Sequence, residues 1–180
     1  MLTACAESKW ASPTLRRHAY IARAWSNKNI GNLTAAVADQ ESAFQIDSEK
    51  SYQELINYAL YLRAAGRASD SLIPLRSAEA IDKSKGWTSM VTQYHLGWTF
   101  QELKRHEDAV AAFSRGIPNQ PEFAYAYYRR GLSLEALGKK KLARADFEKV
   151  GQLIKRHDRG NTSETEIPVL RKKLDEYGIQ

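Results

Sequence analysis

The residues most capable of chemistry in this 180-residue chain are four histidines and a single cysteine. The histidines are scattered along the sequence: His18, His95, His106 and His157. None stands at a metal-binding spacing from another histidine or from the cysteine. The sequence also has neither the Gly-x-Ser-x-Gly turn of serine hydrolases nor a glycine-rich phosphate-binding loop. It therefore predicts a protein that is not an enzyme, with no catalytic residues, no metal and no cofactor.

Cys5 is the only cysteine, so it has no partner for a disulfide within the chain. It completes the run Leu2-Thr3-Ala4-Cys5, which resembles the lipobox of bacterial lipoproteins, where the cysteine carries the lipid. The resemblance implies lipidation of Cys5 and a membrane location facing the bacterial periplasm, with residues 1–14 as a tether. A signal peptide needs a basic and then an apolar segment upstream, and only Met1 to Ala4 precede the cysteine. The alternative is an accidental match and a cytoplasmic protein.

The formal net charge is +6, and basic residues are most frequent in the last third of the chain. They gather around Lys139–Lys141, between residues 144 and 159, and around Arg171–Lys173. Such an excess favours attraction to an acidic partner, to anionic lipid or to nucleic acid. A solvated helix face is the alternative, because acidic residues such as Glu135 and Glu148 are interspersed. No recognisable nucleic-acid-binding module accompanies these residues, so we expect no nucleic acid among the partners.

Two segments that begin at Met90 and Ala124 repeat one pattern 34 residues apart. Small residues stand at the eighth and twentieth positions and an aromatic residue at the twenty-fourth: Gly97, Ala109 and Phe113, then Gly131, Ala143 and Phe147. Small residues at these positions let two paired helices approach closely, and the large residue fills the remaining space. The period and the pattern resemble the tetratricopeptide repeat. This resemblance implies an all-α fold of stacked helix pairs and a protein-binding function.

Fainter copies of the pattern precede these two segments. Gly31 and Gly66, taken as the fifteenth position, place earlier repeats near Arg17 and Tyr52. The spacing of 38 residues between Tyr52 and Met90 exceeds the usual period. We attribute the excess to a longer polar loop at residues 82–86.

The sequence thus predicts an all-α, right-handed tetratricopeptide superhelix, or α-solenoid, of about four helix pairs. The repeats occupy residues 15–156, and residues 157–180 form a linker and a capping helix. In this last helix one face is apolar and the opposite face is charged; the apolar residues are Ile167, Leu170, Leu174 and Tyr177. A repeat array needs such a cap, because its last unit otherwise exposes a stacking surface. No apolar run is long enough to predict a transmembrane helix.

In tetratricopeptide folds, the first helix of each pair lines a concave groove. Carried onto this sequence, the resemblance implies a groove lined mainly by apolar and aromatic side chains: Trp25, Ile56, Leu60, Arg63, Tyr94, Trp98, Gln101, Tyr125, Tyr128 and Leu132. Tyrosine and tryptophan are enriched at binding hot spots. One alternative is that several of these aromatics belong to the core, as aromatics at helical spacing commonly do. Another is that the C-terminal helix or the N-terminal tether occupies the groove.

These features favour a scaffold or adaptor that binds a protein or peptide segment in the groove and helps to assemble a complex of the bacterial envelope. Ile21 and Trp25 stand where tetratricopeptide domains that clamp a terminal carboxylate have lysine and asparagine. We therefore expect apolar and aromatic contacts to the partner in place of a carboxylate clamp. The alternative function is a soluble chaperone that shields a hydrophobic client segment, like the small tetratricopeptide chaperones of secretion systems.

Overall fold

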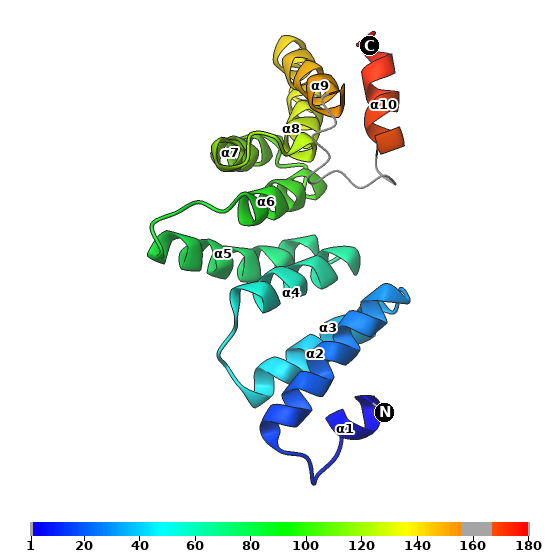
Figure 1. Cartoon of the computed structure of the whole chain (residues 1–180), viewed down its shortest axis with the longest axis vertical. Coiled ribbons are helices and arrows are strands. Elements are labelled where there is room, and N and C mark those ends of the chain that lie inside the picture. Colours follow the sequence, from blue (N-terminus) through cyan, green and yellow to red (C-terminus); the bar gives the residue numbers. More distant parts are fainter. Residues whose placement is uncertain (1, 156–166, 180) are drawn as a thin grey trace. The chain divides into compact units, whose positions relative to one another are not determined.

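The computed structural model describes residues 2–155 and 167–179. Ten α-helices and one short 3₁₀ helix, η1, cover most of this part of the chain, and no strand occurs within it (Figure 1). The chain divides into two compact units, Met1–Ile81 and Asp82–Gln180. The predicted all-α fold of paired helices is confirmed.

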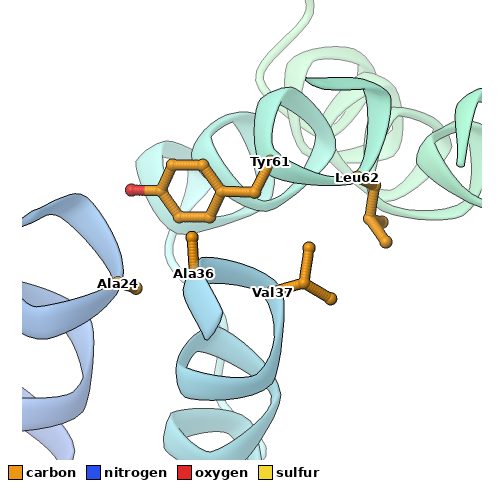
Figure 2. Close-up of a cluster of buried hydrophobic side chains, with 5 residues drawn as sticks. All are labelled: Ala24, Ala36, Val37, Tyr61 and Leu62. Atoms are coloured by element: carbon orange, nitrogen blue, oxygen red, sulfur yellow. The ribbon is translucent and has the colours of Figure 1, made fainter. Parts of the chain in front are cut away.

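The first unit contains two helix pairs preceded by a short helix. Its helices are α1 (Leu2–Ala6), α2 (Pro13–Asn29), α3 (Leu33–Ile46), α4 (Tyr52–Ala64) and α5 (Ala68–Ser84), of which α5 continues past Ile81. Ala24 on α2 and Ala36 on α3 are the eighth and twentieth residues of the first repeat, and both are fully buried. Figure 2 shows them beside Val37, Tyr61 and Leu62, with which they form a hydrophobic core. The small residues thus lie where the paired helices meet.

The second unit contains two further pairs and a last helix. Its elements are α6 (Met90–Glu102), α7 (His106–Gly116), η1 (Ile117–Asn119), α8 (Ala124–Ala136), α9 (Lys140–Lys155) and α10 (Ile167–Glu176). A Cβ atom built on Gly97 would lie 2.6 Å from a ring atom of Phe113, and one built on Gly131 would lie 2.6 Å from a ring atom of Phe147. Both rings are fully buried. The absence of a side chain at the eighth position therefore makes room for the aromatic ring of the second helix.

Serine caps and a left-handed turn residue set the ends of the helices. Ser12, Ser51 and Ser89 each accept a hydrogen bond from the backbone N–H three residues later, at the start of α2, α4 and α6. The fifteenth residue of every repeat has a positive φ: Gly31 (79°), Gly66 (77°), Lys104 (59°) and Gly138 (71°). Glycine adopts this conformation without the steric cost that a side chain adds. This shared turn keeps all four repeats in one register.

The helix starts agree with the counted repeats except in the first. The helices α4, α6 and α8 begin at Tyr52, Met90 and Ala124, the residues from which the repeats were counted. By contrast, α2 begins at Pro13 and not near Arg17, because the Ser12 cap lies further upstream and proline suits a first helical turn.

The expected loop at residues 82–86 is wrong in part. Residues up to Ser84 extend α5, and only the following residues form a turn. Asp82 is almost fully buried, at 2% exposure, and its carboxylate accepts a hydrogen bond from the Thr92 hydroxyl (2.6 Å). The hydrogen bond from Thr92 thus holds Asp82 in a buried position near the end of α5.

The N-terminal residues fold where a tether was expected. Leu2–Ala6 form α1, in which Ala6 is fully buried and Cys5 is half-buried. Arg16 Nε on α2 donates a hydrogen bond to the Ala6 carbonyl oxygen (3.4 Å). Residues 2–6, part of the predicted tether over residues 1–14, thus form a short helix that packs against α2. Lipidation of Cys5 stays a prediction.

The predicted capping helix is present as α10, which packs on α9. Leu170 and Leu174 of α10 are buried, at 0% and 6% exposure. The Tyr177 ring meets the Phe147 ring edge-on, with 4.7 Å between their centroids. These contacts cover the stacking face of the fourth repeat. Most of the predicted linker, up to residue 166, lies outside the described residues.

Candidate partner-binding surface

The first helices α6 and α8 present a group of half-buried side chains, here named the Trp98 surface: Trp98, Gln101, Tyr128, Arg129 and Leu132. Four of the five are predicted groove residues, and Arg129 is new. Trp98 and Leu132 stand at the ninth position of successive repeats. Half-buried aromatic and aliphatic groups offer apolar area to a partner at a low cost in conformational entropy.

Within this surface, Arg129 on α8 contacts three side chains of α6. Its guanidinium carbon lies 3.4 Å from the centroid of the Trp98 ring, which is a close cation–π contact. Its Nε donates to the Tyr94 hydroxyl (3.0 Å), and its Nη1 donates to Gln101 Oε1 (3.3 Å). The Gln101 amide donates in return to the Arg129 carbonyl oxygen (2.6 Å) and to the Ser133 hydroxyl (2.8 Å). The positions of these side chains are thus fixed within the unbound chain.

The helix α10 and Tyr177, which directly follows it, make the equivalent contact with the next repeat. Gln101, the twelfth residue of its repeat, contacts two residues that lie four positions apart on α8. Glu135, the twelfth residue of the next repeat, binds Lys173 Nζ (2.8 Å) and accepts a hydrogen bond from the Tyr177 hydroxyl (2.8 Å). Lys173 and Tyr177 also lie four positions apart. The position of α10 relative to α8, as judged by these contacts, is therefore equivalent to that of α8 relative to α6.

The charges of Glu135 and Lys173 stabilise each other. Burial alone would raise the pKa of Glu135, but hydrogen bonds from Lys173 and Tyr177 hold it below the usual value of 4.5. Burial would lower the pKa of Lys173, but hydrogen bonds to Glu135 and Glu176 raise it to about 12. Both groups are therefore charged at neutral pH, where the pair links α10 to α8.

This pair is expected to make the stability of the fold sensitive to acid. A carboxyl group whose pKa is depressed by folding stabilises the fold above its unfolded pKa, and the stabilisation is lost as the pH falls through the folded pKa. Urea unfolding of Glu135→Gln should therefore change less than that of the unmodified chain when the pH is lowered below 4.5. Glu148→Gln is the control, because the Arg144–Glu148 pair is about half exposed and contributes little. Equal acid sensitivity in both variants would contradict this assignment.

Tyr94 and Tyr125, expected to be exposed in the groove, are buried at 9% and 6% exposure. That expectation is wrong because both rings pack around Phe123, at centroid distances of 4.9 and 6.1 Å. The Tyr94 hydroxyl is also occupied as the acceptor for Arg129. The Tyr94 and Tyr125 side chains thus belong to the packing between neighbouring elements.

In the first unit, the predicted groove residues again divide by burial. Trp25 on α2 is 61% exposed and Leu60 on α4 is half-buried. Ile56 and Arg63 are buried, at 2% and 8% exposure, so they do not line an exposed surface. A binding role for Trp25 and Leu60 stays a prediction.

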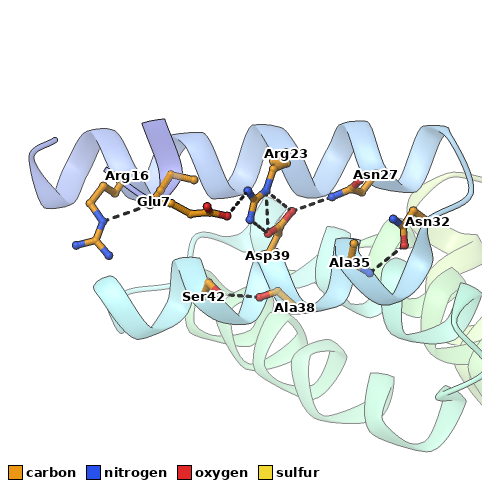
Figure 3. A network of polar contacts seen from close by, with 10 residues as sticks. Glu7, Arg16, Arg23, Asn27, Asn32, Ala35, Ala38, Asp39 and Ser42 are labelled. Carbon is orange, nitrogen blue, oxygen red and sulfur yellow. Dashed lines mark hydrogen bonds and ion pairs between the residues drawn. The ribbon is translucent and has the colours of Figure 1, made fainter. Parts of the chain in front are cut away.

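An arginine–aspartate pair, which the sequence analysis missed, recurs in the first and fourth repeats. Arg23 on α2 binds both carboxylate oxygens of Asp39 on α3, the shortest distance being 2.6 Å, and Asn27 adds another hydrogen bond (Figure 3). Arg130 on α8 binds Asp146 on α9 in the same way, with a shortest distance of 2.7 Å. In both repeats the partners are 16 residues apart, at the seventh and twenty-third positions. Alignment of the repeats would have shown this shared spacing.

Each of these arginines also reaches the element before its own repeat. Arg23 Nη1 donates to Glu7, which directly follows α1 (3.0 Å). Arg130 Nη1 donates to the Ser114 hydroxyl on α7 (3.0 Å). The spacing is again 16 residues in both contacts. The hydrogen bond between α2 and the residue after α1 is therefore equivalent to the one between α8 and α7.

The described histidines and Cys5 lie on different helices. His18, His95 and His106 lie on α2, α6 and α7, and His157 lies outside the described residues. Within residues 2–155 and 167–179, no three or more histidine, cysteine, aspartate or glutamate side chains form a group that could hold a metal ion. No helix in that part of the chain is both long enough and apolar enough to cross a membrane.

The sequence matches the family model of the tetratricopeptide repeat over residues 92–115 and 125–153. These segments fall within the third and fourth repeats, where the sequence pattern is clearest. A search of curated proteins found no match to the chain.

Several solved structures share the fold at low sequence identity. MamA (residues 41 to the end) from Desulfovibrio magneticus RS-1 has a TM-score of 0.73 at 17% identity, covering 90% of this chain and 84% of that chain. A tetratricopeptide repeat protein from Parabacteroides merdae has a TM-score of 0.67 at 21% identity, covering 89% and 62%. BtubC from P. vanneervenii has a TM-score of 0.73 at 16% identity, covering 90% and 71%. The chain therefore has a helical-repeat fold of the tetratricopeptide type, and two of its repeats match that family in sequence.

Proposed function

We propose that this chain is a non-catalytic interaction scaffold that binds a segment of another protein on the Trp98 surface. The stacking of Arg129 on Trp98, fixed by Tyr94 and Gln101, carries the proposal. A surface whose side chains are already ordered loses little entropy when a partner binds. The extended face of a helical-repeat array also suits the binding of a chain segment.

The chemistry of the surface defines the kind of segment that it binds. Trp98, Tyr128 and Leu132 supply apolar area, whereas Arg129 and Gln101 supply polar groups close to it. The polar groups are already hydrogen-bonded within the chain. The main contacts are therefore between the apolar side chains of the surface and apolar or aromatic residues of the segment.

A more specific version of this proposal is that the chain takes part in a complex of the bacterial envelope and is attached to the membrane through Cys5. It rests on the Leu2-Thr3-Ala4-Cys5 run. Because Cys5 is half-buried on α1, attachment of a lipid requires its thiol side to face away from α2. Mass spectrometry of the protein isolated from its native cells tests this version. A lipid mass on the peptide that contains Cys5 would support it, and an unmodified Cys5 would contradict it.

The Trp98 surface is tested with peptides selected from a random display library on the intact chain. Trp98→Ala and Tyr128→Ala should each weaken binding of the selected peptides by about tenfold or more, as expected for aromatic hot spots. Fluorescence polarisation of labelled peptides measures the affinity, and circular dichroism measures helical content and melting of the same samples.

Leu142→Ala is the matched control for these substitutions. Leu142 lies on α9, is 58% exposed and is outside the Trp98 surface, so its replacement should leave the affinity unchanged. Wild-type affinity in both aromatic variants would refute the proposed surface. Loss of helical structure in either variant would assign that side chain to the core. Selection of unrelated hydrophobic peptides without a common pattern would favour the soluble chaperone.

A further inference from the structure

An exposed tryptophan, Trp87, lies in the turn between α5 and α6. It follows Gly86, whose φ of 73° turns the chain after the end of α5. The Trp87 backbone N–H donates to the Asp82 carbonyl oxygen (3.2 Å), and in turns of this kind an apolar residue at this position frequently packs on its own helix. Trp87 is nevertheless 56% exposed. Its backbone is thus held in place while much of its side chain stays open to solvent.

The beginning of α6 and the end of α7 add further exposed groups around this turn. Val91 on α6 is 46% exposed. Arg115 on α7 is exposed, and its Nε donates to Gln93 Oε1 at the beginning of α6 (3.0 Å). Lys85 is exposed in the turn itself. We name Lys85, Trp87, Val91 and Arg115 the Trp87 surface, and all four belong to the second unit.

The charges of this surface have one sign. No acidic residue occurs in residues 83–101 or 109–121, the two segments that contain the surface. Asp82, which precedes the first segment, is only 2% exposed. The acidic residues of α6 and α7 stand at the opposite ends of these two helices. The Trp87 surface therefore combines exposed apolar groups with positive charge.

A similar arrangement precedes α2 in the first unit. Trp10 is 98% exposed, and it directly follows Lys9, which is also exposed. Trp10 stands two residues before the cap Ser12, just as Trp87 stands two residues before the cap Ser89. An exposed tryptophan with a nearby lysine thus recurs before a first helix in each unit. Its position is tied to the start of that helix.

These features fit the headgroup region of an anionic lipid bilayer. Tryptophan has an apolar body and a polar N–H, and it is enriched where a membrane meets water. Each lysine or arginine near an anionic leaflet strengthens binding by about fivefold. A bilayer also yields around an exposed side chain, whereas a folded partner needs a pocket that matches it. Nucleic acid fits less well, because its bases stack on aromatic rings and Val91 has none.

We propose that the Trp87 surface binds an anionic lipid bilayer. Trp87 and Val91 enter the headgroup region, and Lys85 and Arg115 lie beside the lipid phosphates. Such a contact is peripheral and needs no helix that crosses the membrane. It is separate from partner binding on the Trp98 surface and from attachment through Cys5. The proposal is therefore tested on protein that carries no lipid on Cys5.

Flotation with lipid vesicles measures the binding. The unmodified chain should bind vesicles of phosphatidylcholine and phosphatidylserine much more strongly than vesicles of phosphatidylcholine alone. Added salt should weaken this binding, because it screens the attraction between the charges. Trp87→Ala should weaken it by about tenfold, through the loss of apolar area. Lys85→Glu should weaken it by about tenfold or more, because it reverses one charge.

Two matched variants serve as controls. Trp25→Ala removes a tryptophan of similar exposure, 61%, that lies outside the Trp87 surface. Lys104→Glu makes the same change in net charge as Lys85→Glu, at an exposed residue beyond the other end of α6. Both controls should bind anionic vesicles as the unmodified chain does. Circular dichroism should show the same helical content in all four variants.

Tryptophan fluorescence shows which ring enters the bilayer. Anionic vesicles with brominated acyl chains should quench the unmodified chain and Trp25→Ala, but Trp87→Ala much less. Equal binding to neutral and anionic vesicles would overturn the proposal. Binding of Trp87→Ala and Lys85→Glu at the level of their controls would do the same. Binding to a single-stranded oligonucleotide without binding to vesicles would also overturn it, and would assign the positive charge to nucleic acid.

Discussion

Replacement of Phe147 by alanine is expected to lower the free energy of unfolding by about 3–5 kcal/mol. The Phe147 ring is fully buried and lies against the backbone of Gly131. It also contacts the Tyr177 ring, at 4.7 Å between centroids, and the Tyr128 ring, at 6.3 Å. Removal of the ring leaves a cavity where α8, α9 and α10 meet. Urea unfolding followed by circular dichroism measures the loss.

Phe147→Leu is the control for this prediction, because it keeps most of the volume and all of the apolar character. Its cost should be about 1 kcal/mol, as for other substitutions that nearly conserve volume. If Phe147→Ala lowers the free energy of unfolding no more than Phe147→Leu does, the prediction is wrong. The three helices would then move together to fill the cavity, and the packing around Phe147 would be less rigid than its burial indicates.

The second large effect is expected from Asp146→Ala, at about 3–5 kcal/mol, because it leaves the Arg130 guanidinium with no carboxylate partner. The side chains of Arg130 and Asp146 are 21% and 8% exposed, so water replaces the lost contact poorly. Hydrogen bonding to Asp146 also holds the pKa of Arg130 above its usual value. The free energy of unfolding should therefore fall much more than it does when an exposed pair is broken.

The double substitution Arg130→Met with Asp146→Leu distinguishes the loss of the ion pair from the cost of leaving a buried charge without its partner. Two apolar residues of similar size leave no charge in the core, and the double variant should be close to the unmodified chain in stability. Glu148→Ala, in the half-exposed pair with Arg144, should cost less than about 1 kcal/mol. An Asp146→Ala variant that loses no more stability than Glu148→Ala would mean that the Arg130–Asp146 pair is effectively solvated.

The repeat register could be predicted because it depends on local steric requirements. A residue without a side chain at Gly97 or Gly131 is needed wherever a second helix approaches this closely, and that need is visible in the sequence. The start of α2 was missed because a hydroxyl cap at Ser12 and a proline at position 13 set it. These two signals are independent of the repeat pattern. The fold of α1 was missed for a related reason, since five residues show too little periodicity.

The candidate surface was predicted only in part, because burial depends on neighbours that are distant in the sequence. Trp98 and Tyr128 keep exposed area, but Tyr94 is enclosed by residues up to 35 positions away. Arg129 looks like an ordinary polar residue of a helix until Trp98 and Gln101 are brought beside it. No local pattern specifies a contact that requires side chains from two different repeats.

The recurrence of one buried ion pair has a consequence for how the array loses structure. In a linear array, each repeat draws stability from itself and from its neighbours, and opening proceeds inward from repeats that have fewer neighbours. The Arg23–Asp39 and Arg130–Asp146 pairs lie within the first and fourth repeats, whereas Leu96 and Ala112 hold the same positions in the third. Each outer repeat thus has an internal clasp between its two helices. Separation of the two helices of either outer repeat must therefore break that ion pair.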